Sequence, residues 1–227
     1  MRRAYVEASV PVEEAFALAL EWAGEDAAIR VGDTGTVSDN PWLEKLGLPI
    51  TSGSGRTRFR GSPRGTVIAA FLNLGEVLEL ERSAQVEGIV VVAASGKLDW
   101  LPTVSGHAPW ITAFDVECLG GNEISRIQEA SEPVKAAVKG LTRTAIPNQG
   151  LASSLERSEV VQALTYYRGR GIELDPDALM VEALRNRWGA TGPEDLREIA
   201  IELNKGKNLK FEKRISPQVL QKWAAAQ

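Results

Sequence analysis

The chain has 227 residues, 44% of them hydrophobic and 25% charged, which excludes disordered and fibrous proteins and predicts a globular fold that needs no metal or disulfide. A net charge of −4 argues against a protein that coats nucleic acid with its whole surface, but it is compatible with a local basic site. One cysteine and one histidine exclude an internal disulfide and most zinc sites. The sequence shows no signal-peptide pattern and no apolar run of roughly 20 residues, so we expect a cytoplasmic protein outside the membrane.

Five short apolar or β-branched runs alternate with helical patterns over the first two-thirds of the chain. They cover residues 4–8, 27–33, 65–72, 88–94 and 115–121. Three of them lack polar alternation, which is typical of strands covered on both faces, although a buried helix shows the same pattern. Because strands separated by helices form parallel βαβ units, we expect an open, mainly parallel, Rossmann-like α/β sheet of about five strands flanked by helices.

The helices between these strands are predicted from their start and stop residues. Pro11 at a first-turn position begins a helix that Gly24 ends. A short helix is expected within 38–47, behind the cap Asn40, and another within 74–83, behind the cap Asn73. Two short helices are expected within 98–114, where Pro102 and Gly106 interrupt the pattern.

The pattern becomes helical after Asn122. Residues 122–141 are helix-like, with Pro133 as a point of kinking or restart, and residues 144–154 are small and polar, as in a linker. Four further helical patterns follow, at 156–167, 175–188, 193–204 and 216–225. We therefore predict an α/β sheet domain over 1–147 and an all-helical C-terminal region over 148–227.

The turns that leave the predicted strands form the candidate ligand site, because parallel sheets bind ligands at the carboxyl ends of their strands. These turns are small and polar, which favours a nucleotide or another phosphorylated small molecule of unknown identity. The same residue types also occur in turns that bind nothing. The candidate ligand-binding residues are Asp33, Thr34, Gly35, Asn73, Ser95, Gly96, Lys97, Asp99, Asn122 and Glu123.

A loop at 52–65, SGSGRTRFRGSPRG, is strongly basic and lies in a stretch without carboxylates from Lys45 to Gly75. It matches neither the P-loop nor the dinucleotide fingerprint. Arginines beside an aromatic ring predict nucleic-acid binding, while the alternative is a solvated loop whose arginines pair with nearby acids. A loop before a strand is expected at the edge opposite the ligand turns unless it folds over. The candidate nucleic-acid-binding residues here are Arg56, Arg58, Phe59, Arg60 and Arg64.

A second basic stretch, 205–214, adds Lys205, Lys207 and Lys210 to the nucleic-acid hypothesis. The predicted helices on either side of it, 195–204 and 216–225, are similar to a helix-turn-helix in being amphipathic. Their connection of 11 residues is longer than the three or four of the DNA-reading motif, and its alternation is compatible with a short strand. The simpler alternative is a packed helical region with a solvated lysine loop.

No residue pattern assigns a catalytic role. His107 has no acidic partner placed by a motif, so a capping or surface role is the simpler interpretation, and Cys118 is most simply a small core residue. An enzyme that acts on a phosphorylated substrate through Asp33, Lys97, Asp99 or Glu123 is the third hypothesis, after small-molecule binding and nucleic-acid association.

Overall fold

The structure, a computed structural model, describes residues 1–53, 59, 61–93, 104–143, 151 and 154–227. These residues form two compact units, Met1–Arg126 and Ile127–Gln227, which we call the sheet unit and the helical unit. The division falls earlier than the boundary expected after residue 147, because the helix that begins at Glu132 shares a core with the C-terminal helices. In the described part of the chain, no helix has the length and apolarity needed to cross a membrane.

Six strands, all parallel, form the sheet in the order β3-β2-β4-β5-β1-β6. The N-terminal strand is inserted between β5 and β6, with Ala4 paired to Val90 on one side and Glu117 on the other. The predicted parallel α/β sheet with a helical C-terminal region is therefore confirmed. The strands are β1 (Arg2–Val6), β2 (Ala28–Val31), β3 (Ile50–Ser52), β4 (Gly65–Ala70), β5 (Val86–Val92) and β6 (Glu117–Gly120).

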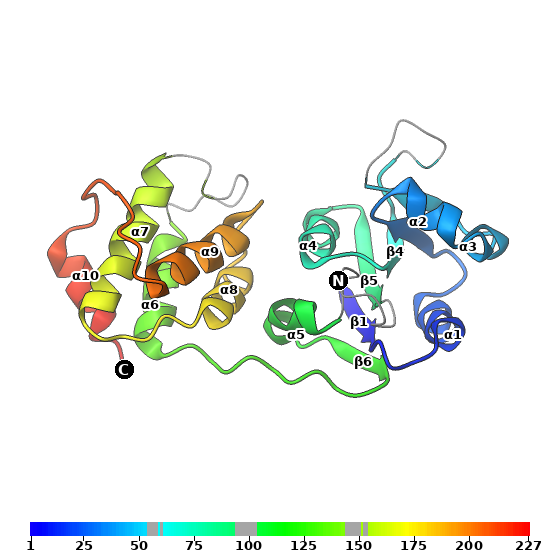
Figure 1. The fold of residues 1–227 in the computed structure, drawn as a ribbon, viewed down its shortest axis with the longest axis horizontal. Coiled ribbons are helices and arrows are strands. Elements are labelled where there is room, and N and C mark those ends of the chain that lie inside the picture. Colours follow the sequence, from blue (N-terminus) through cyan, green and yellow to red (C-terminus); the bar gives the residue numbers. More distant parts are fainter. Residues whose placement is uncertain (54–58, 60, 94–103, 144–150, 152–153) are drawn as a thin grey trace. The chain divides into compact units, whose positions relative to one another are not determined.

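Helices lie on both faces of the sheet (Figure 1). On one face, α1 (Val12–Ala23), α2 (Thr34–Asp39) and α3 (Trp42–Lys45) share a core with alternate strand residues such as Ile29, Ile68 and Val90. On the other face lie α4 (Leu74–Arg82), the 3₁₀ turn η1 (Val104–His107) and α5 (Ala108–Phe114). Burial on both faces explains why the central strands have uninterrupted apolar sequences.

The strand order creates two points where neighbouring strands send their connections to opposite faces of the sheet. At the first, β2 leads into α2 and β4 leads into α4. At the second, β1 leads into α1 and β5 leads to η1 and α5. Open parallel sheets bind ligands at such switch points, beyond the carboxyl ends of the strands.

Two local predictions need correction. The sequence prediction did not include β3, whose three residues form the edge strand beside β2. Residues 122–131 are not helical, and the helix of this region begins only at Glu132, with Pro133 in its first turn. Pro133 therefore starts the helix rather than kinking one, because proline has no N–H to donate within a helix.

The helical unit contains α6 (Glu132–Leu141), α7 (Ser154–Gly169), α8 (Pro176–Arg185), α9 (Gly192–Asn204) and α10 (Pro217–Ala224). Their shared core includes Val138, Leu164, Tyr167, Leu179 and Leu203, all at most 1% exposed. All four C-terminal helical patterns are thus confirmed, and α6 is the fifth member of the group.

The suggested similarity to a helix-turn-helix is wrong. The last helix, α10, packs mainly against α6, whereas α9 packs mainly against α8. The connection between α9 and α10 is neither a tight turn nor a strand, but a stretch of irregular backbone from Lys205 to Ser216.

Candidate functional site: the carboxyl rim of the sheet

The turns after the six strands lie along one edge of the sheet, which we call the carboxyl rim. Because all six strands are parallel, every strand contributes its exit turn to this edge. Gly32 and Asp33 follow β2, Gly53 follows β3, and Asn73 lies beyond β4. The predicted ligand turns are therefore on the same edge, as the sequence interpretation required.

Two of the predicted ligand residues are helix caps. The Asp33 carboxylate accepts hydrogen bonds from the Thr36 N–H (2.9 Å) and the Thr36 hydroxyl (3.3 Å), at the start of α2. Thr34 and Gly35 form the first turn of that helix. These interactions explain the local sequence by capping, so the side chain of Asp33 already has partners within the protein.

Asn73 begins α4 in a capping box with Glu76. Asn73 Oδ1 accepts the Glu76 N–H at 3.0 Å, and Glu76 Oε2 accepts the Asn73 N–H at 2.8 Å. A Cβ at position 32 would lie 2.8 Å from Glu76 Oε1, so glycine makes room for this carboxylate beside β2. The first switch point therefore carries a negative charge at the N-terminus of α4, where an anionic ligand would otherwise be favoured.

Asn122 lies at the opposite end of the rim, beside Glu7. Glu7 Oε2 accepts hydrogen bonds from the Ser9 hydroxyl, from the Ser9 N–H (3.0 Å) and from the Asn122 N–H (3.4 Å). The Ser9 hydroxyl lowers the pKa of the Glu7 carboxyl, and the backbone N–H groups add to this effect against the opposing influence of burial. Glu7 therefore joins the turns after β1 and β6.

Glu123 is part of an exposed ion-pair group next to this turn. Its carboxylate lies 3.9 Å from the Arg126 guanidinium, which also pairs with Asp115 at 3.1 Å. Asn122 and Glu123 are thus separated from Asp33 and Asn73 by β1 and β5, and the predicted ligand residues form two groups on the rim. The other four, Ser95, Gly96, Lys97 and Asp99, lie outside the described residues.

His107 is buried at the rim, with 1% of its surface exposed. Its Nε2 lies 3.1 Å from the carbonyl oxygen of Leu72, which accepts the hydrogen bond directly before the Asn73 cap. The histidine is therefore a structural donor between η1 and the exit of β4. It is buried and not on the surface, and it occupies the N-cap position of α5, although its side chain makes no capping hydrogen bond there.

The arginine-rich loop begins at the carboxyl rim, and not at the opposite edge of the sheet that was expected for a loop before a strand. It leaves β3 directly, and the Gly53 N–H continues the pairing by donating to the Val31 carbonyl at 3.1 Å. The loop returns to the same place, because the Ser52 N–H donates to the Phe59 carbonyl at 2.9 Å. The missed strand β3 thus brings this loop to the edge where the ligand turns lie.

The individual residues of the loop differ in position. Phe59 is half-buried and packs against the core on the α1 face, so part of its ring is covered by protein. Arg64 is exposed and directly precedes β4, which places it near the opposite, amino edge of the sheet. Arg56, Arg58 and Arg60 lie outside the described residues.

Arg30 is a charged residue at the rim that the sequence interpretation missed. It lies in β2 on the α4 face, since its neighbours Ile29 and Val31 point into the core on the α1 face. Its Nη1 donates to the carbonyl oxygens of Ser52 (2.8 Å), where the arginine-rich loop begins, and Gly61 (3.4 Å), within the loop. Among the described residues, no carboxylate pairs with it. The signal in the sequence was a single arginine inside an otherwise apolar strand.

Lys205, Lys207 and Lys210 belong to the helical unit and lie after α9. All three are exposed, and Lys207 forms an ion pair with Glu202. Together with Lys205 and Lys210 it belongs to a basic segment whose backbone is held against α7 by hydrogen bonds.

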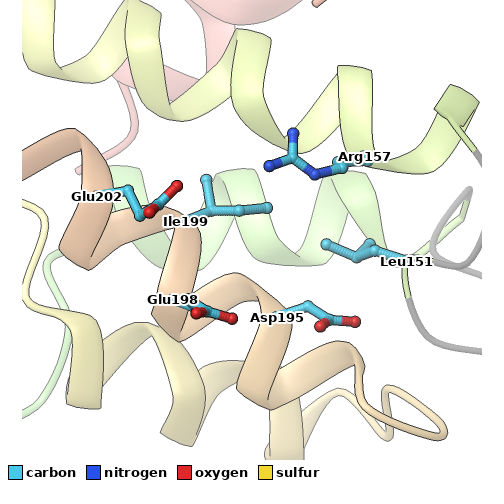
Figure 2. A pocket seen from close by; sticks show the side chains of 6 residues that line it. All are labelled: Leu151, Arg157, Asp195, Glu198, Ile199 and Glu202. Atoms are coloured by element: carbon cyan, nitrogen blue, oxygen red, sulfur yellow. The ribbon is translucent and has the colours of Figure 1, made fainter. Parts of the chain in front are cut away.

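The helical unit also contains a pocket of about 250 Å³ between α7 and α9. Figure 2 shows Arg157 on one wall and Asp195 and Glu198 on the other. Its volume is below the roughly 300–1,000 Å³ of small-molecule sites, and its three carboxylates disfavour an anion. The remaining lining residues are Leu151, Ile199 and Glu202.

Residues 131–224 match a protein family described as a domain of unknown function, DUF1889. The match covers α6 to α10, and therefore the helical unit rather than the carboxyl rim. No curated protein and no solved structure matches the chain. Within the described residues, no cluster of three or more histidine, cysteine, aspartate or glutamate side chains is arranged to hold a metal ion.

Proposed function

We propose that the sheet unit binds a nucleotide or another phosphorylated small molecule at the carboxyl rim, beside β2 and β3. The observation that supports this most is Arg30, a strand arginine directed to the rim whose partners among the described residues are backbone carbonyls. A guanidinium that is not neutralised by a carboxylate is suited to bind an anion.

The hydrogen-bonding capacity of Arg30 supports the same proposal. A guanidinium has five N–H donors in a planar fork, and Nη1 makes both of the hydrogen bonds described above. In the described part of the chain, neither Nε nor Nη2 has an acceptor. A phosphate oxygen pair fits such an edge because guanidinium and phosphate bind in a bidentate manner.

The charge distribution of the sheet unit also favours this part of the rim. The unit has 17 aspartates and glutamates against 11 lysines and arginines. Four of those arginines lie between Ser52 and Gly65, in a stretch where no acid occurs. Three of the four, Arg56, Arg58 and Arg60, lie in the sequence between Ser52 and Gly61, the residues that Arg30 contacts, so an otherwise acidic unit has a basic stretch there, which favours anions locally.

The capping box restricts where a phosphate would bind. Glu76 places its carboxylate at the N-terminus of α4 and beside Gly32, so a phosphate at that helix end would be repelled. We therefore place the anion on the β2–β3 side of the switch point, with Arg30 and the arginine-rich loop as its partners, rather than at Asn73.

The proposal is tested by titrating the full chain with phosphorylated compounds in a calorimeter. ATP, GTP, NAD and inorganic phosphate serve as probes, and adenosine tests whether a phosphate is needed. For any compound that binds, Arg30→Gln is expected to weaken Kd by about 10- to 100-fold, since a hydrogen bond to a charged group contributes about 1.5–3 kcal/mol. Arg30→Lys retains the charge but loses the planar fork of donors. Its Kd should lie between those of the unaltered chain and Arg30→Gln.

Arg2→Gln is the matched control. Arg2 is also a strand arginine that donates to a backbone carbonyl, that of Trp22 at 3.4 Å, but it lies at the amino end of β1. Its substitution should leave Kd unchanged. The proposal is wrong if none of the phosphorylated probes binds, or if Arg2→Gln and Arg30→Gln weaken binding equally.

A further inference from the structure

The segment Lys205–Arg214, which we call the basic segment, carries five positive charges and one negative charge. We infer that it is a binding site for the sugar–phosphate backbone of a nucleic acid. This inference is independent of the small-molecule site proposed above, because it concerns the helical unit.

The backbone of the basic segment is fixed by α7, although it has no regular secondary structure. Gln162, which is 7% exposed, donates through Nε2 to the Ile215 carbonyl at 2.8 Å. Its Oε1 accepts the N–H groups of Arg214 (2.8 Å) and Ile215 (2.9 Å). Closer to α9, Arg168 donates to the carbonyls of Leu203 (2.7 Å) and Lys207 (3.5 Å). A merely solvated lysine loop needs no such attachments.

The apolar side chains of the basic segment point into the core of the helical unit. Leu209 and Phe211 pack against that core, as does Ile215 directly after the segment. Lys210, between Leu209 and Phe211, is exposed. The segment therefore presents lysines while its apolar residues are partly buried against the core, whereas a membrane-binding segment presents apolar residues to the lipid. This contrast favours nucleic acid over a lipid surface.

Three of the five cations have no ion-pair partner in the described part of the chain. Lys207 pairs with Glu202, and Arg214 pairs with Glu212. Lys205, Lys210 and Lys213 are exposed and carry their charges along the segment. The segment is attached to α7 at Arg168, near Lys207, and at Gln162, next to Lys213, which are about 9 Å apart along the helix axis, so its charges follow α7. A linear polyanion with a charge at about every 3.4 Å of each strand matches this array.

Arg157 lies close to the start of the basic segment. Lys207, through its hydrogen bond, lowers the pKa of the Glu202 carboxyl, and the charges of Arg157 and Lys205 act in the same direction.

The acidic wall of the pocket, Asp195 and Glu198, lies on α9 (Figure 2). Those carboxylates would repel phosphates, so the bound strand is expected to follow the basic segment and not the face of α9.

The test measures binding of the full chain to fluorescent single-stranded and duplex oligonucleotides of about 20 nucleotides or base pairs, from about 50 to 200 mM salt. The triple variant Lys205→Gln/Lys210→Gln/Lys213→Gln is expected to weaken binding to unrelated sequences alike. It should also reduce the slope of log K against log salt by about 2 to 3, because three phosphate contacts are lost. Arg30→Gln should leave this slope unchanged.

The control triple variant Lys139→Gln/Arg187→Gln/Lys222→Gln removes the same charge from other exposed positions of the helical unit. It should retain the slope of the unaltered chain. The inference is overturned if neither oligonucleotide binds at about 50 mM salt, or if the two triple variants behave alike. It is also overturned if phosphatidylserine vesicles bind through the three lysines while the oligonucleotides do not.

Discussion

The indole of Trp223, on α10, lies directly against the backbone of Gly140, on α6. A Cβ atom at position 140 would come within 2.2 Å of Cζ2 of the indole, which no pair of non-bonded atoms tolerates. Gly140 is thus required in the last turn of α6, although glycine has a low helix propensity. This contact holds α10 against α6 in the helical unit.

Gly140→Ala is expected to destabilise the helical unit by about 1–3 kcal/mol. Helix propensity alone predicts the opposite, a gain of up to about 1 kcal/mol, so the sign of the change distinguishes the two effects. Urea unfolding followed by tryptophan fluorescence measures it. Adding Trp223→Leu to Gly140→Ala should recover part of the loss, whereas stabilisation by Gly140→Ala alone would show that the indole moves away freely.

Glu81→Leu is expected to destabilise the sheet unit by about 3–5 kcal/mol. The Glu81 side chain is 11% exposed, accepts hydrogen bonds from Arg3 Nε at 3.1 Å and accepts the Trp110 Nε1–H at 3.1 Å. Its removal leaves a largely covered guanidinium and an indole N–H without their partner. Thermal or urea unfolding provides the measurement.

Two variants on the same helix calibrate that result. Glu81→Gln keeps an acceptor oxygen and should cost less than Glu81→Leu. Glu79→Leu changes an exposed residue of α4 and should lie within about 0.5 kcal/mol of the unaltered chain. Equal losses for Glu79→Leu and Glu81→Leu would contradict the role given to the Arg3–Glu81 pair.

The contribution of Glu7 to stability should depend on pH. The pKa of its carboxyl is lower in the folded chain than its ordinary value of 4.5, so its stabilising effect is present above that value and is lost as the pH falls through the folded pKa. The difference in unfolding free energy between the unaltered chain and Glu7→Gln should therefore be larger at neutral pH and shrink below about pH 4.

Urea unfolding of the unaltered chain and of Glu7→Gln over this pH range measures the difference in unfolding free energy. The other carboxylates titrate in both chains, so their contributions cancel in the difference. Ser9→Ala is the control, because it removes the largest cause of the shift and should reduce the pH dependence without removing the charge. A difference that stays constant from neutral to acidic pH would rule out the hydrogen-bonded carboxylate as its source.

Gln162→Leu should release the basic segment while leaving its charges intact. The substitution removes the acceptor of the Arg214 and Ile215 N–H groups and the donor to the Ile215 carbonyl. We expect faster hydrogen exchange at residues 214 and 215 and faster tryptic cleavage within 205–214. Gln162→Glu, which keeps the acceptor, should be intermediate, and Gln221→Leu on exposed α10 should cleave at the original rate.

Much of the fold could be predicted because its elements have strong local signals. The uninterrupted runs of β4 and β5 indicated doubly covered strands, and the Asn73 cap gave the start of α4. In contrast, β3 has three residues and no distinctive pattern, and it forms only because Ile29, Arg30 and Val31 offer an edge for pairing. Short edge strands depend on tertiary pairing, which is not visible locally.

The candidate site was predictable only in part for the same reason. Exit turns such as Asp33 and Asn122 could be assigned to the carboxyl rim once the strands were recognised as parallel. The placement of the arginine-rich loop depended on β3, and the importance of Arg30 depends on the loop that its guanidinium holds. Such features come from residues distant in sequence, so periodicity and capping patterns cannot indicate them.

The position of β1 has a consequence for how the sheet unit folds during synthesis. The strand made first pairs with β5 and β6, and its partner residues Ile89 and Cys118 leave the ribosome much later. Until then β1 has two open edges, which are prone to pair with other chains. Its closure over such long sequence distances should make folding slow, and a chain shortened before β6 should be the form most prone to aggregate.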